Sequence, residues 1–256
     1  MNLLDRQREH FNTVAEQYRT AREGANHLLL KHLIWNEALG GIDRFRGKKT
    51  RVLEALCGFA DGRELPGKYL GTEIDYEGYD FSDEVVREMN EEHPDIKVWQ
   101  ADATTFVPEE EGYDIIVIVG GIHHVPDHAK QVVTNHARGL KKGGLFINFE
   151  PTFGNPVQRA VREGIYSRNE MFDDVTERSF AVGELFDMFT SAGLKPVKKL
   201  YPGLLSYILF YNPEAFPGLN LGGEYMVKAA FGIDRLFMSN FVGRTFSFAT
   251  LSVWER

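Results

Sequence analysis

Short apolar segments alternate with amphipathic segments through the middle of the chain. Apolar segments of four or five residues predict buried strands at residues 51–55, 77–81, 97–100, 115–119 and 145–149. The stretches between them have helical character at residues 62–70, 83–92 and 129–140. Strands that alternate with helices are typical of a parallel sheet with helices on both faces. We therefore predict an α/β fold with a doubly wound, mostly parallel sheet.

Capping signals mark two ends of these helices. Ser82 precedes Asp83 and Glu84. This favours a helix start, because the serine hydroxyl accepts a backbone hydrogen bond and the acids stabilise the positive end of the helix dipole. Gly143 and Gly144 follow two lysines, which predicts the end of a helix before a strand.

The alternation weakens on both sides of this core. Residues 5–38 have apolar positions at helical spacing and predict two helices separated at Gly24. Residues 152–178 are polar with scattered aromatic residues and predict an excursion over the sheet. The elements predicted after it are a helix at 182–192, a strand at 195–200, a helix at 225–238 and a closing strand at 245–254. The added strands make the predicted sheet seven-stranded.

Composition narrows the choice of partner and compartment. The net charge is −8 and the pI is near 5.5, whereas nucleic-acid binding favours a basic face, so we expect no nucleic-acid partner. The single cysteine, Cys57, cannot form an internal disulfide and suits a reducing cytoplasm. The charged N-terminus lacks the apolar core of a signal peptide. Since no apolar run reaches the roughly 20 residues that span a bilayer, we expect a cytoplasmic protein without stable membrane insertion.

Residues 51–61, RVLEALCGFAD, carry the strongest signal for a ligand. An apolar strand ends at Glu54 and a turn through Gly58 precedes a helix, which is where α/β folds bind nucleotide-like ligands. Asp80 ends the next predicted strand about 20 residues later, a spacing at which an acid accepts hydrogen bonds from ribose hydroxyls. Glu54 is placed to face the amino group of a cationic ligand. Both acids could instead be solvated residues at strand ends.

A dinucleotide dehydrogenase is a weaker alternative, because CGFADG lacks the first two glycines of G-x-G-x-x-G at the right spacing.

Residues 51–151 resemble the class I S-adenosylmethionine-dependent methyltransferases, in particular the quinone-biosynthesis type and related small-molecule enzymes. The matching segments follow the family's order and include one helix upstream. They are FNTVAEQY at 11–18, VLEALCG at 52–58, GYDFS at 78–82, QADA at 100–103, IVGGIHHV at 118–125 and LKKGG at 140–144. The resemblance implies a Rossmann-like methyltransferase fold and S-adenosyl-L-methionine as cofactor.

The same motifs imply which residues hold the cofactor. Asp80 would bind the ribose, Asp102 the adenine amino group, and Tyr18 would close over the cofactor from the upstream helix. Cys57 and Gly58 would face the aminoacyl part. The remaining cofactor contacts are expected from Glu54, Ala55, Phe81, Ala103 and Gly120.

The turn departs from the family's motif at two positions. Leu56 stands where the family usually has its first glycine and Ala60 where it has its third. Leu56 is expected to take an ordinary backbone angle, unless the turn differs. Cys57 is a possible nucleophile on paper, but no partner for it is visible, and a small residue packed in the turn is the favoured interpretation.

The candidate catalytic residues are His123, His124 and Glu150. The histidines follow the fourth predicted strand, and imidazole titrates near neutrality, which suits acid/base catalysis; capping a helix is the alternative. Glu150 ends the fifth strand and would orient a hydroxyl, take a proton or cap the next loop. No third His, Cys or carboxylate stands at zinc-ligand spacing with the histidines, so no metal site is expected.

The acceptor is the least determined part of this interpretation. Apolar residues between positions 204 and 241 would line a pocket for a large acceptor, form core, or form a homodimer surface. Tyr166 and Arg168 are candidate substrate contacts.

We predict one domain, with N-terminal helices at 1–46, a cofactor-binding core at 47–151, and a substrate-side excursion, lid and closing strands at 152–256. The predicted activity is methyl transfer to a small-molecule or lipid-like acceptor. The alternative is a cofactor-binding protein without methyl transfer, with a regulatory or cyclase-like role.

Overall fold

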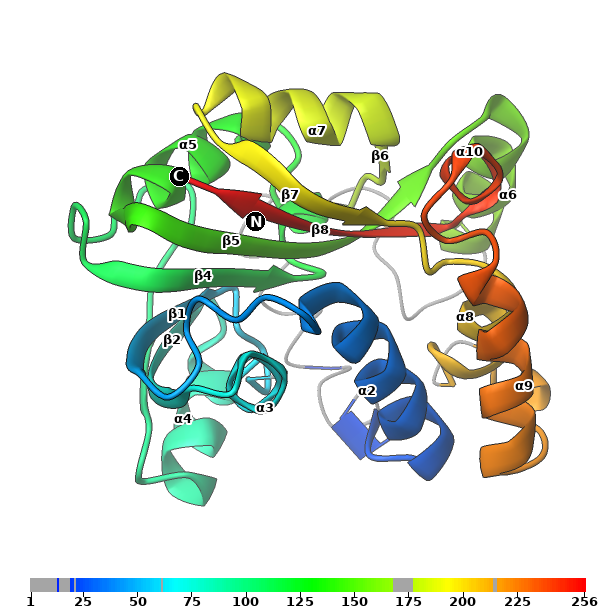
Figure 1. Ribbon diagram of the computed structural model, residues 1–256, viewed down its shortest axis with the longest axis horizontal. Coiled ribbons are helices and arrows are strands. Elements are labelled where there is room, and N and C mark those ends of the chain that lie inside the picture. Colours follow the sequence, from blue (N-terminus) through cyan, green and yellow to red (C-terminus); the bar gives the residue numbers. More distant parts are fainter. Residues whose placement is uncertain (1–12, 14–18, 21, 61, 168–176, 214–215) are drawn as a thin grey trace.

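The protein is built on one mixed, mostly parallel sheet, as predicted. The computed structural model describes residues 13, 19–20, 22–60, 62–167, 177–213 and 216–256. The strand order is β3-β2-β1-β4-β5-β8-β7 (Figure 1). The strands are β1 Lys49–Ala55, β2 Glu73–Asp80, β3 Lys97–Gln100, β4 Tyr113–Val119, β5 Leu140–Phe153, β7 Lys195–Leu200 and β8 Ala249–Glu255. The strands from β3 to β5 are parallel, and β8 is antiparallel to both β5 and β7. A short strand β6, Phe180–Ala181, pairs with the end of β5.

Helices cover both faces of the sheet (Figure 1). The first face packs against α2 Ala25–Leu39, α3 Leu65–Leu70, α4 Asp83–Glu92, α8 Leu205–Phe210 and α9 Glu224–Arg235. The second packs against α5 Ala129–Gly139 and α7 Val182–Ser191. Helices α6 Pro156–Tyr166 and α10 Phe241–Phe246, with the 3-10 turns η1 Ile122–His124 and η2 Pro217–Leu219, complete the described elements. None of the helices in the described part of the chain is both long and apolar enough to cross a membrane.

The unbroken apolar runs of the central strands follow from this double covering. In β4, Ile115 and Val117 belong to the core on the first face, while Ile116 and Ile118 belong to the core on the second. Successive side chains of a strand point to opposite faces, so both sets must be apolar when both faces are buried. This explains why the strands read as continuous runs and not as alternating ones.

Some predicted element ends agree with the structure and others do not. Ser82 caps α4, and its hydroxyl accepts a hydrogen bond of 3.2 Å from the Val85 amide. Gly143 does not end a helix: α5 already ends at Gly139, and Gly143 lies within β5 with a φ of +76°. The closing strand begins at Ala249, because Asn240 caps the short helix α10 and draws residues 241–246 into it.

The N-terminal helix and the C-terminal helices form one structure at the carboxyl edge of the sheet. Helix α2 begins after Gly24, as predicted, and packs against α8 and α9 (Figure 1). The His27 Nδ1 lies 2.7 Å from the carbonyl oxygen of Tyr211, and the Asn26 amide donates to the Asn220 side chain at 2.8 Å. These contacts join the N-terminal helix α2 to the C-terminal part of the chain. The division of the chain into cap, core and lid remains a prediction.

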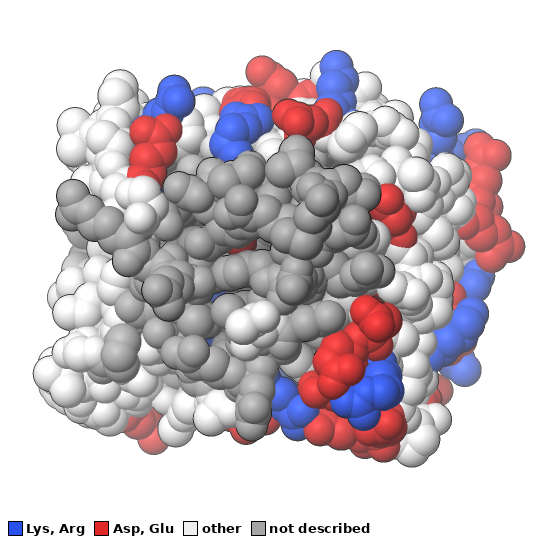
Figure 2. Space-filling model, turned by 180° about the vertical axis from the view of Figure 1, so that it is seen from behind, with Lys and Arg blue, Asp and Glu red and all other residues white. Residues whose placement is uncertain are grey.

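Charged side chains of both signs are interleaved on the surface. Figure 2 shows the molecule from behind relative to Figure 1, with acidic and basic groups next to each other around the edge of this view. One such cluster joins α4 to residue 19, where the Arg19 guanidinium lies 2.6 Å from Glu92. Mixed charges of this kind are typical of an ordinary solvated surface.

Candidate active site

Three residues of the turn after β1 have the left-handed backbone conformation that glycine adopts most easily, although only one of the three is a glycine. Leu56, Gly58 and Ala60 have φ values of +51°, +50° and +57°. The expectation that Leu56 takes an ordinary angle is therefore wrong, and the turn keeps its left-handed conformations without the glycines. A left-handed backbone costs a residue with a Cβ about 1–2 kcal/mol. Only Gly58 avoids this cost, and nothing lies within 4 Å of the place where a Cβ would stand on it.

Asp80 ties this turn to the neighbouring strand. Its Oδ2 accepts a hydrogen bond of 2.8 Å from the Gly58 amide, and its Oδ1 accepts one of 2.9 Å from the Ser82 amide. Burial raises the pKa of Asp80, and these backbone donors act against that rise. Asp80 thus holds the tip of β2 against the turn after β1.

Asp102 lies at the tip of the third strand in the same row. The Ala101 amide donates to the Asp80 carbonyl oxygen at 2.9 Å, which places Asp102 beside Asp80. Asp102 Oδ1 accepts from the amide and the hydroxyl of Thr104, both at 2.8 Å. Two other predicted cofactor contacts are in this row: Ala103, which is buried, and Phe81, whose carbonyl oxygen accepts from the Gln100 side chain. The structure therefore brings the predicted acids to one edge of the sheet.

Glu54 lies beneath the turn, in the interior. Its Oε1 accepts a hydrogen bond of 2.9 Å from the Gly62 amide, and its Oε2 accepts one of 2.5 Å from the Tyr76 hydroxyl. A Cβ on Gly62 would stand 2.8 Å from Glu54 Oε1, so the glycine is needed for this contact. Glu54 fastens the turn to the start of the next helix and to β2. Its direct contact with a ligand amino group stays a prediction.

Cys57 is packed inside the turn. Its side chain is buried, and its sulfur would lie 3.2 Å from a Cβ on Gly78. Burial, together with the nearby carboxylates of Asp80 and Glu54, raises the pKa of the thiol well above its ordinary value. A thiol of this kind is a poor nucleophile, which favours the packing interpretation. Ala55, before the turn, is likewise fully buried.

His123 and Glu150 form a buried pair between the ends of β4 and β5. His123 Nδ1 lies 2.8 Å from Glu150 Oε2, and both side chains are buried. Glu150 Oε1 also accepts from the amides of Gly121 and Ile122 at 2.9 and 2.8 Å. A carboxylate with these donors favours an Nδ1–H on the imidazole, so that Nε2 carries the lone pair.

The protonation of this pair is set mainly by its burial. Burial raises the pKa of Glu150 to about 7, against the backbone donors of the turn. Burial, with the charges of Arg162 and Arg22, lowers the pKa of His123 to about 3. The two groups interact directly, so they titrate as a unit. The lowered pKa of His123 favours a neutral imidazole at neutral pH.

A cavity of about 350 Å³ opens beside this pair. Gly120, His123, His124 and Glu150 lie on its floor, at the ends of β4 and β5. Aromatic side chains form one wall: Tyr207 and Tyr211 stack with ring centroids 4.7 Å apart, and Tyr211 meets Phe149 edge-on at 5.2 Å. The remaining lining residues are Arg22, Val119, Pro151, Val161, Arg162, Ile165, Glu177, Ile208, Asn212, Phe216, Leu219 and Phe248.

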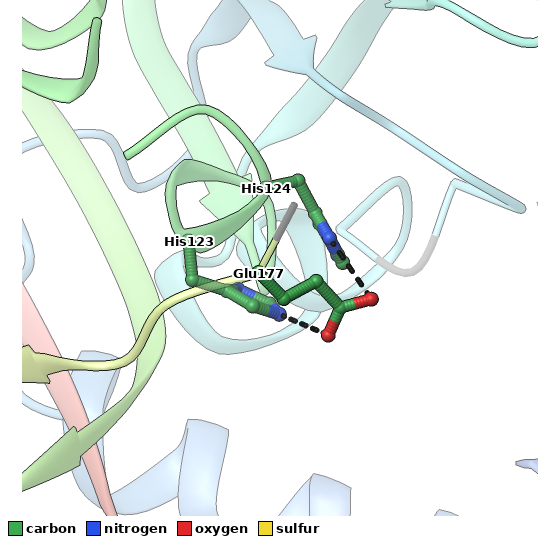
Figure 3. Close-up of side chains that lie close together, drawn as sticks. All are labelled: His123, His124 and Glu177. Carbon is green, nitrogen blue, oxygen red and sulfur yellow. Dashed lines mark ion pairs between the residues drawn. The ribbon is translucent and has the colours of Figure 1, made fainter. Parts of the chain in front are cut away.

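The structure adds Glu177 to the two histidines (Figure 3). Glu177 Oε2 lies 3.9 Å from His123 Nε2, and Glu177 Oε1 lies 3.5 Å from His124 Nδ1. The three residues could hold a metal ion. Sequence spacing missed this group, because Glu177 arrives from the segment before β6 and no local pattern links it to the histidines.

Three of the predicted contacts cannot be placed. Tyr18 and Arg168 lie outside the described residues, and so does the side chain of Tyr166. Arg22, Arg162 and the aromatic wall are site residues that sequence reasoning missed. The apolar stretch after position 204 indicated the aromatic wall. No sequence pattern pointed to Arg22 or Arg162.

Comparison with known proteins agrees with this architecture. Residues 52–144 match the family model described as "Methyltransferase domain". The demethylmenaquinone methyltransferase of Staphylococcus aureus (strain JH9) is 28% identical over 123 residues, which are 47% of this chain and 50% of that protein. The chain thus spans about half the length of the curated relatives it matches.

Solved structures share the fold over almost the whole chain. The phosphoethanolamine N-methyltransferase 2 of Haemonchus contortus, in complex with S-adenosyl-L-methionine, has a TM-score of 0.67 at 14% identity, covering 98% of this chain and 60% of that one. A putative sarcosine dimethylglycine methyltransferase from Galdieria sulphuraria has a TM-score of 0.58 at 14% identity, covering 93% and 87%. At this identity the similarity shows the fold.

Proposed function

Since the chain belongs to the class I S-adenosylmethionine-dependent methyltransferases, we propose that it transfers a methyl group from S-adenosyl-L-methionine to a small, largely apolar acceptor. The observation that carries the proposal is the position of the cavity. Its floor at Gly120 and His123 follows β4 directly, and β4 is the neighbour of β1 in the sheet. A Cβ on Gly121 would stand 2.8 Å from that of Leu56, so the turn and the cavity floor are in contact.

The residues at the other edge of this turn fit the cofactor. Gly58 faces open space where a side chain would stand, which leaves room for a ligand to approach the backbone. Asp80 accepts hydrogen bonds from the Gly58 amide at Oδ2 and from the Ser82 amide at Oδ1, and a carboxylate can also accept from a ribose hydroxyl. Asp102, one strand further, is in position for the base. Among the described residues, Asp102 Oδ2 has no hydrogen-bond partner and suits the adenine amino group.

The acceptor is chosen by the shape and polarity of the cavity. The stacked rings of Tyr207 and Tyr211 suit a flat apolar body. The guanidinium groups of Arg22 and Arg162 also line the cavity and favour a partial or full negative charge on the acceptor. A planar compound with one ionisable group is therefore the best match to this lining.

The protein's task in the reaction is alignment and proton removal. The sulfonium of the cofactor supplies a reactive methyl group, so holding the acceptor in line with it accounts for much of the acceleration. His123 Nε2, on the cavity floor and 3.9 Å from Glu177 Oε2, is the atom in position to accept the acceptor's proton when no metal ion is bound. Glu150 holds the ring in place and stabilises the imidazolium.

The test is the formation of S-adenosylhomocysteine that depends on an added acceptor. The purified protein is incubated with S-adenosyl-L-methionine and a panel of planar phenols, enols and aromatic amines. Product formation is followed by mass spectrometry. Tyr207→Ala should raise the KM for the acceptor at least tenfold and leave the cofactor Kd unchanged, while Tyr225→Ala, at a position 83% exposed, should change neither. Equal effects of both variants would count against the cavity as the acceptor site.

A cofactor-binding protein without methyl transfer is the second candidate. The same cleft could hold the cofactor as a fixed positive charge beside a cyclising substrate. The two candidates differ in one measurement, because only methyl transfer consumes the cofactor. Substrate conversion with no S-adenosylhomocysteine would favour the second.

A further inference from the structure

The histidine pair and Glu177 meet on the floor of the cavity, and the side chains point toward one another (Figure 3). One ligand atom from each residue lies within 4.8 Å of the others. Ligands of a tetrahedral zinc ion, each about 2.0–2.2 Å from the metal, stand roughly 3.3–3.6 Å apart. Glu177 Oε1 and His124 Nδ1 are already at 3.5 Å, Glu177 Oε2 and His123 Nε2 are at 3.9 Å, and the widest separation must shorten by about 1 Å on binding. We propose that His123, His124 and Glu177 bind a divalent first-row transition-metal ion whose remaining coordination positions face the cavity.

The backbone holds Glu177 against the histidines. The Arg178 amide donates a hydrogen bond of 3.0 Å to the His123 carbonyl oxygen. The Arg178 side chain is held in turn by Glu184 at the start of α7, at 2.7 Å. Two residues further, Phe180 pairs with Thr152 of β5. The residues that follow Glu177 are thus fastened to His123 in η1 and to the end of β5.

His123 has the supporting partner that a metal-ligating histidine needs. Such a histidine almost always donates its other ring N–H to a carboxylate or a carbonyl oxygen, which fixes the tautomer and strengthens the ligand. His123 Nδ1 has Glu150 at 2.8 Å, and Glu150 is held in its turn by two backbone amides. The Nε2 lone pair is thereby directed at Glu177. A histidine that only capped a helix would not need this buried carboxylate.

The ligand set indicates the class of ion. Two imidazoles and one carboxylate are ligands of catalytic zinc and of non-haem iron, whereas magnesium and calcium favour oxygen ligands alone. Three protein ligands leave at least one position for water or substrate. The cavity beside the site supplies the space for that position.

The charges around the site are compatible with a cation. Arg22 and Arg162 line the same cavity and oppose a metal ion, while Glu150 and Glu177 favour it. An acceptor oxyanion between the ion and the arginines would offset part of the excess positive charge. A hydroxylated aromatic or enolic acceptor would therefore bind with its oxygen at the metal.

The catalytic use of the ion rests on the methyl transfer proposed above. A divalent ion lowers the pKa of a coordinated hydroxyl. The O–H proton then leaves to water, the oxygen lone pair forms the new C–O bond, and the electron pair of the broken C–S bond stays on sulfur. In this arrangement His123 serves as a ligand, and its Nε2 does not take the proton.

The experiment uses the full chain, freed of metal by a chelator and titrated with Co²⁺ and with Zn²⁺. One equivalent of Co²⁺ should give the visible absorption bands of a nitrogen- and oxygen-ligated ion, and Zn²⁺ should displace it. Glu177→Gln and His124→Asn should weaken Zn²⁺ binding by roughly 100-fold, and Glu150→Gln by about tenfold through His123. His128→Ala and Glu163→Gln, both at exposed positions, are the matched controls and should bind as the original protein does.

The outcomes separate the metal site from the methyl transfer. Failure to bind one equivalent, or equal affinities in Glu177→Gln, His124→Asn and the controls, would overturn the metal site. Stoichiometric binding together with undiminished S-adenosylhomocysteine formation in the metal-free protein would overturn its role in transfer and return the proton to His123. Spectral changes that disappear in Glu177→Gln support the site even if no acceptor is found. Circular dichroism of each variant excludes misfolding as the cause.

Discussion

Asp80 Oδ2 lies 2.8 Å from the backbone nitrogen of Gly58, so one carboxylate joins the tip of β2 to the turn after β1. The contact fixes the geometry of the cofactor side of the cleft before any ligand arrives. Asp80 holds the turn, and in the proposed function it also meets the ribose. These tasks can be separated by experiment.

Replacing Asp80 should weaken cofactor binding. Asp80→Ala removes the ribose acceptor and the anchor of Gly58, and Asp80→Asn keeps one acceptor oxygen. We expect the Kd for S-adenosyl-L-methionine to rise at least tenfold in Asp80→Ala and less in Asp80→Asn, by isothermal titration calorimetry. Asp75→Ala, exposed on the same strand, is the control. An unchanged Kd in Asp80→Ala would remove the ribose assignment.

Restoring a glycine in the turn should relieve backbone strain. Ala60 has a φ of +57°, and its replacement by glycine removes a cost of about 1–2 kcal/mol. Loss of a buried methyl group and a more flexible unfolded chain offset part of this gain. We expect Ala60→Gly to change the free energy of unfolding by between zero and about +1 kcal/mol. Ala137→Gly, inside α5, should instead lower it by about 1 kcal/mol or more. If urea denaturation shows that Ala60→Gly and Ala137→Gly lower the free energy of unfolding by equal amounts, the turn is not strained.

Acid should destabilise the protein through His136. This side chain is fully buried, with Nδ1 2.7 Å from the Val132 carbonyl oxygen and Nε2 2.8 Å from the Tyr79 hydroxyl. Burial lowers its pKa to about 4, below the value of about 6.5 in the unfolded chain. The unfolded state therefore binds the proton first, and the stability present above pH 6.5 is lost as the pH falls toward 4.

The measurement compares the protein with His136→Gln, which keeps an acceptor for Tyr79 but does not titrate. The raised pKa of Glu150 acts in the opposite sense, so the difference between the two proteins is the readout. Between pH 7.5 and pH 5 the original protein should lose about 2 kcal/mol relative to the variant. Parallel stability curves would contradict the assignment of a neutral His136. His128→Gln, at an exposed position, controls for surface histidines.

Asp234 should hold the aromatic wall of the cavity in place. Its carboxylate lies in α9 and accepts hydrogen bonds from the Leu205 and Ser206 amides at the start of α8, at 3.0 and 2.7 Å. Burial raises its pKa, and the Ser206 hydroxyl and amide oppose the rise. Asp234→Asn should lower the free energy of unfolding by about 2 kcal/mol, because buried donors lose an acceptor.

The same variant should raise the KM for the acceptor and leave the cofactor Kd unchanged, because α8 carries Tyr207 and Ile208 of the cavity. Asp187→Asn, exposed on α7, should affect neither value. A change in cofactor affinity without a change in acceptor KM would place the effect of Asp234 elsewhere.

The sequence by itself determined the sheet and one side of the cleft. Continuous apolar runs such as residues 115–119 can only be buried between two helical layers, and acids at the ends of parallel strands must meet at one edge. The placement of Asp80, Asp102 and Gly58 at one edge was predicted in this way because strand ends and glycine turns leave local signals in the chain, and their contacts with the cofactor stay a prediction.

Only the tertiary structure decided the acceptor side. Glu177 reaches His123 and His124 through the docking of a segment that has no periodic pattern of its own. Arg22, from the N-terminal part of the chain, joins Arg162 and Tyr211 around one cavity for the same reason. Even in the turn, the left-handed backbone of Leu56 contradicted the local preference of leucine. Contacts between distant segments supply the energy that holds such residues in place, and a linear pattern does not record those contacts.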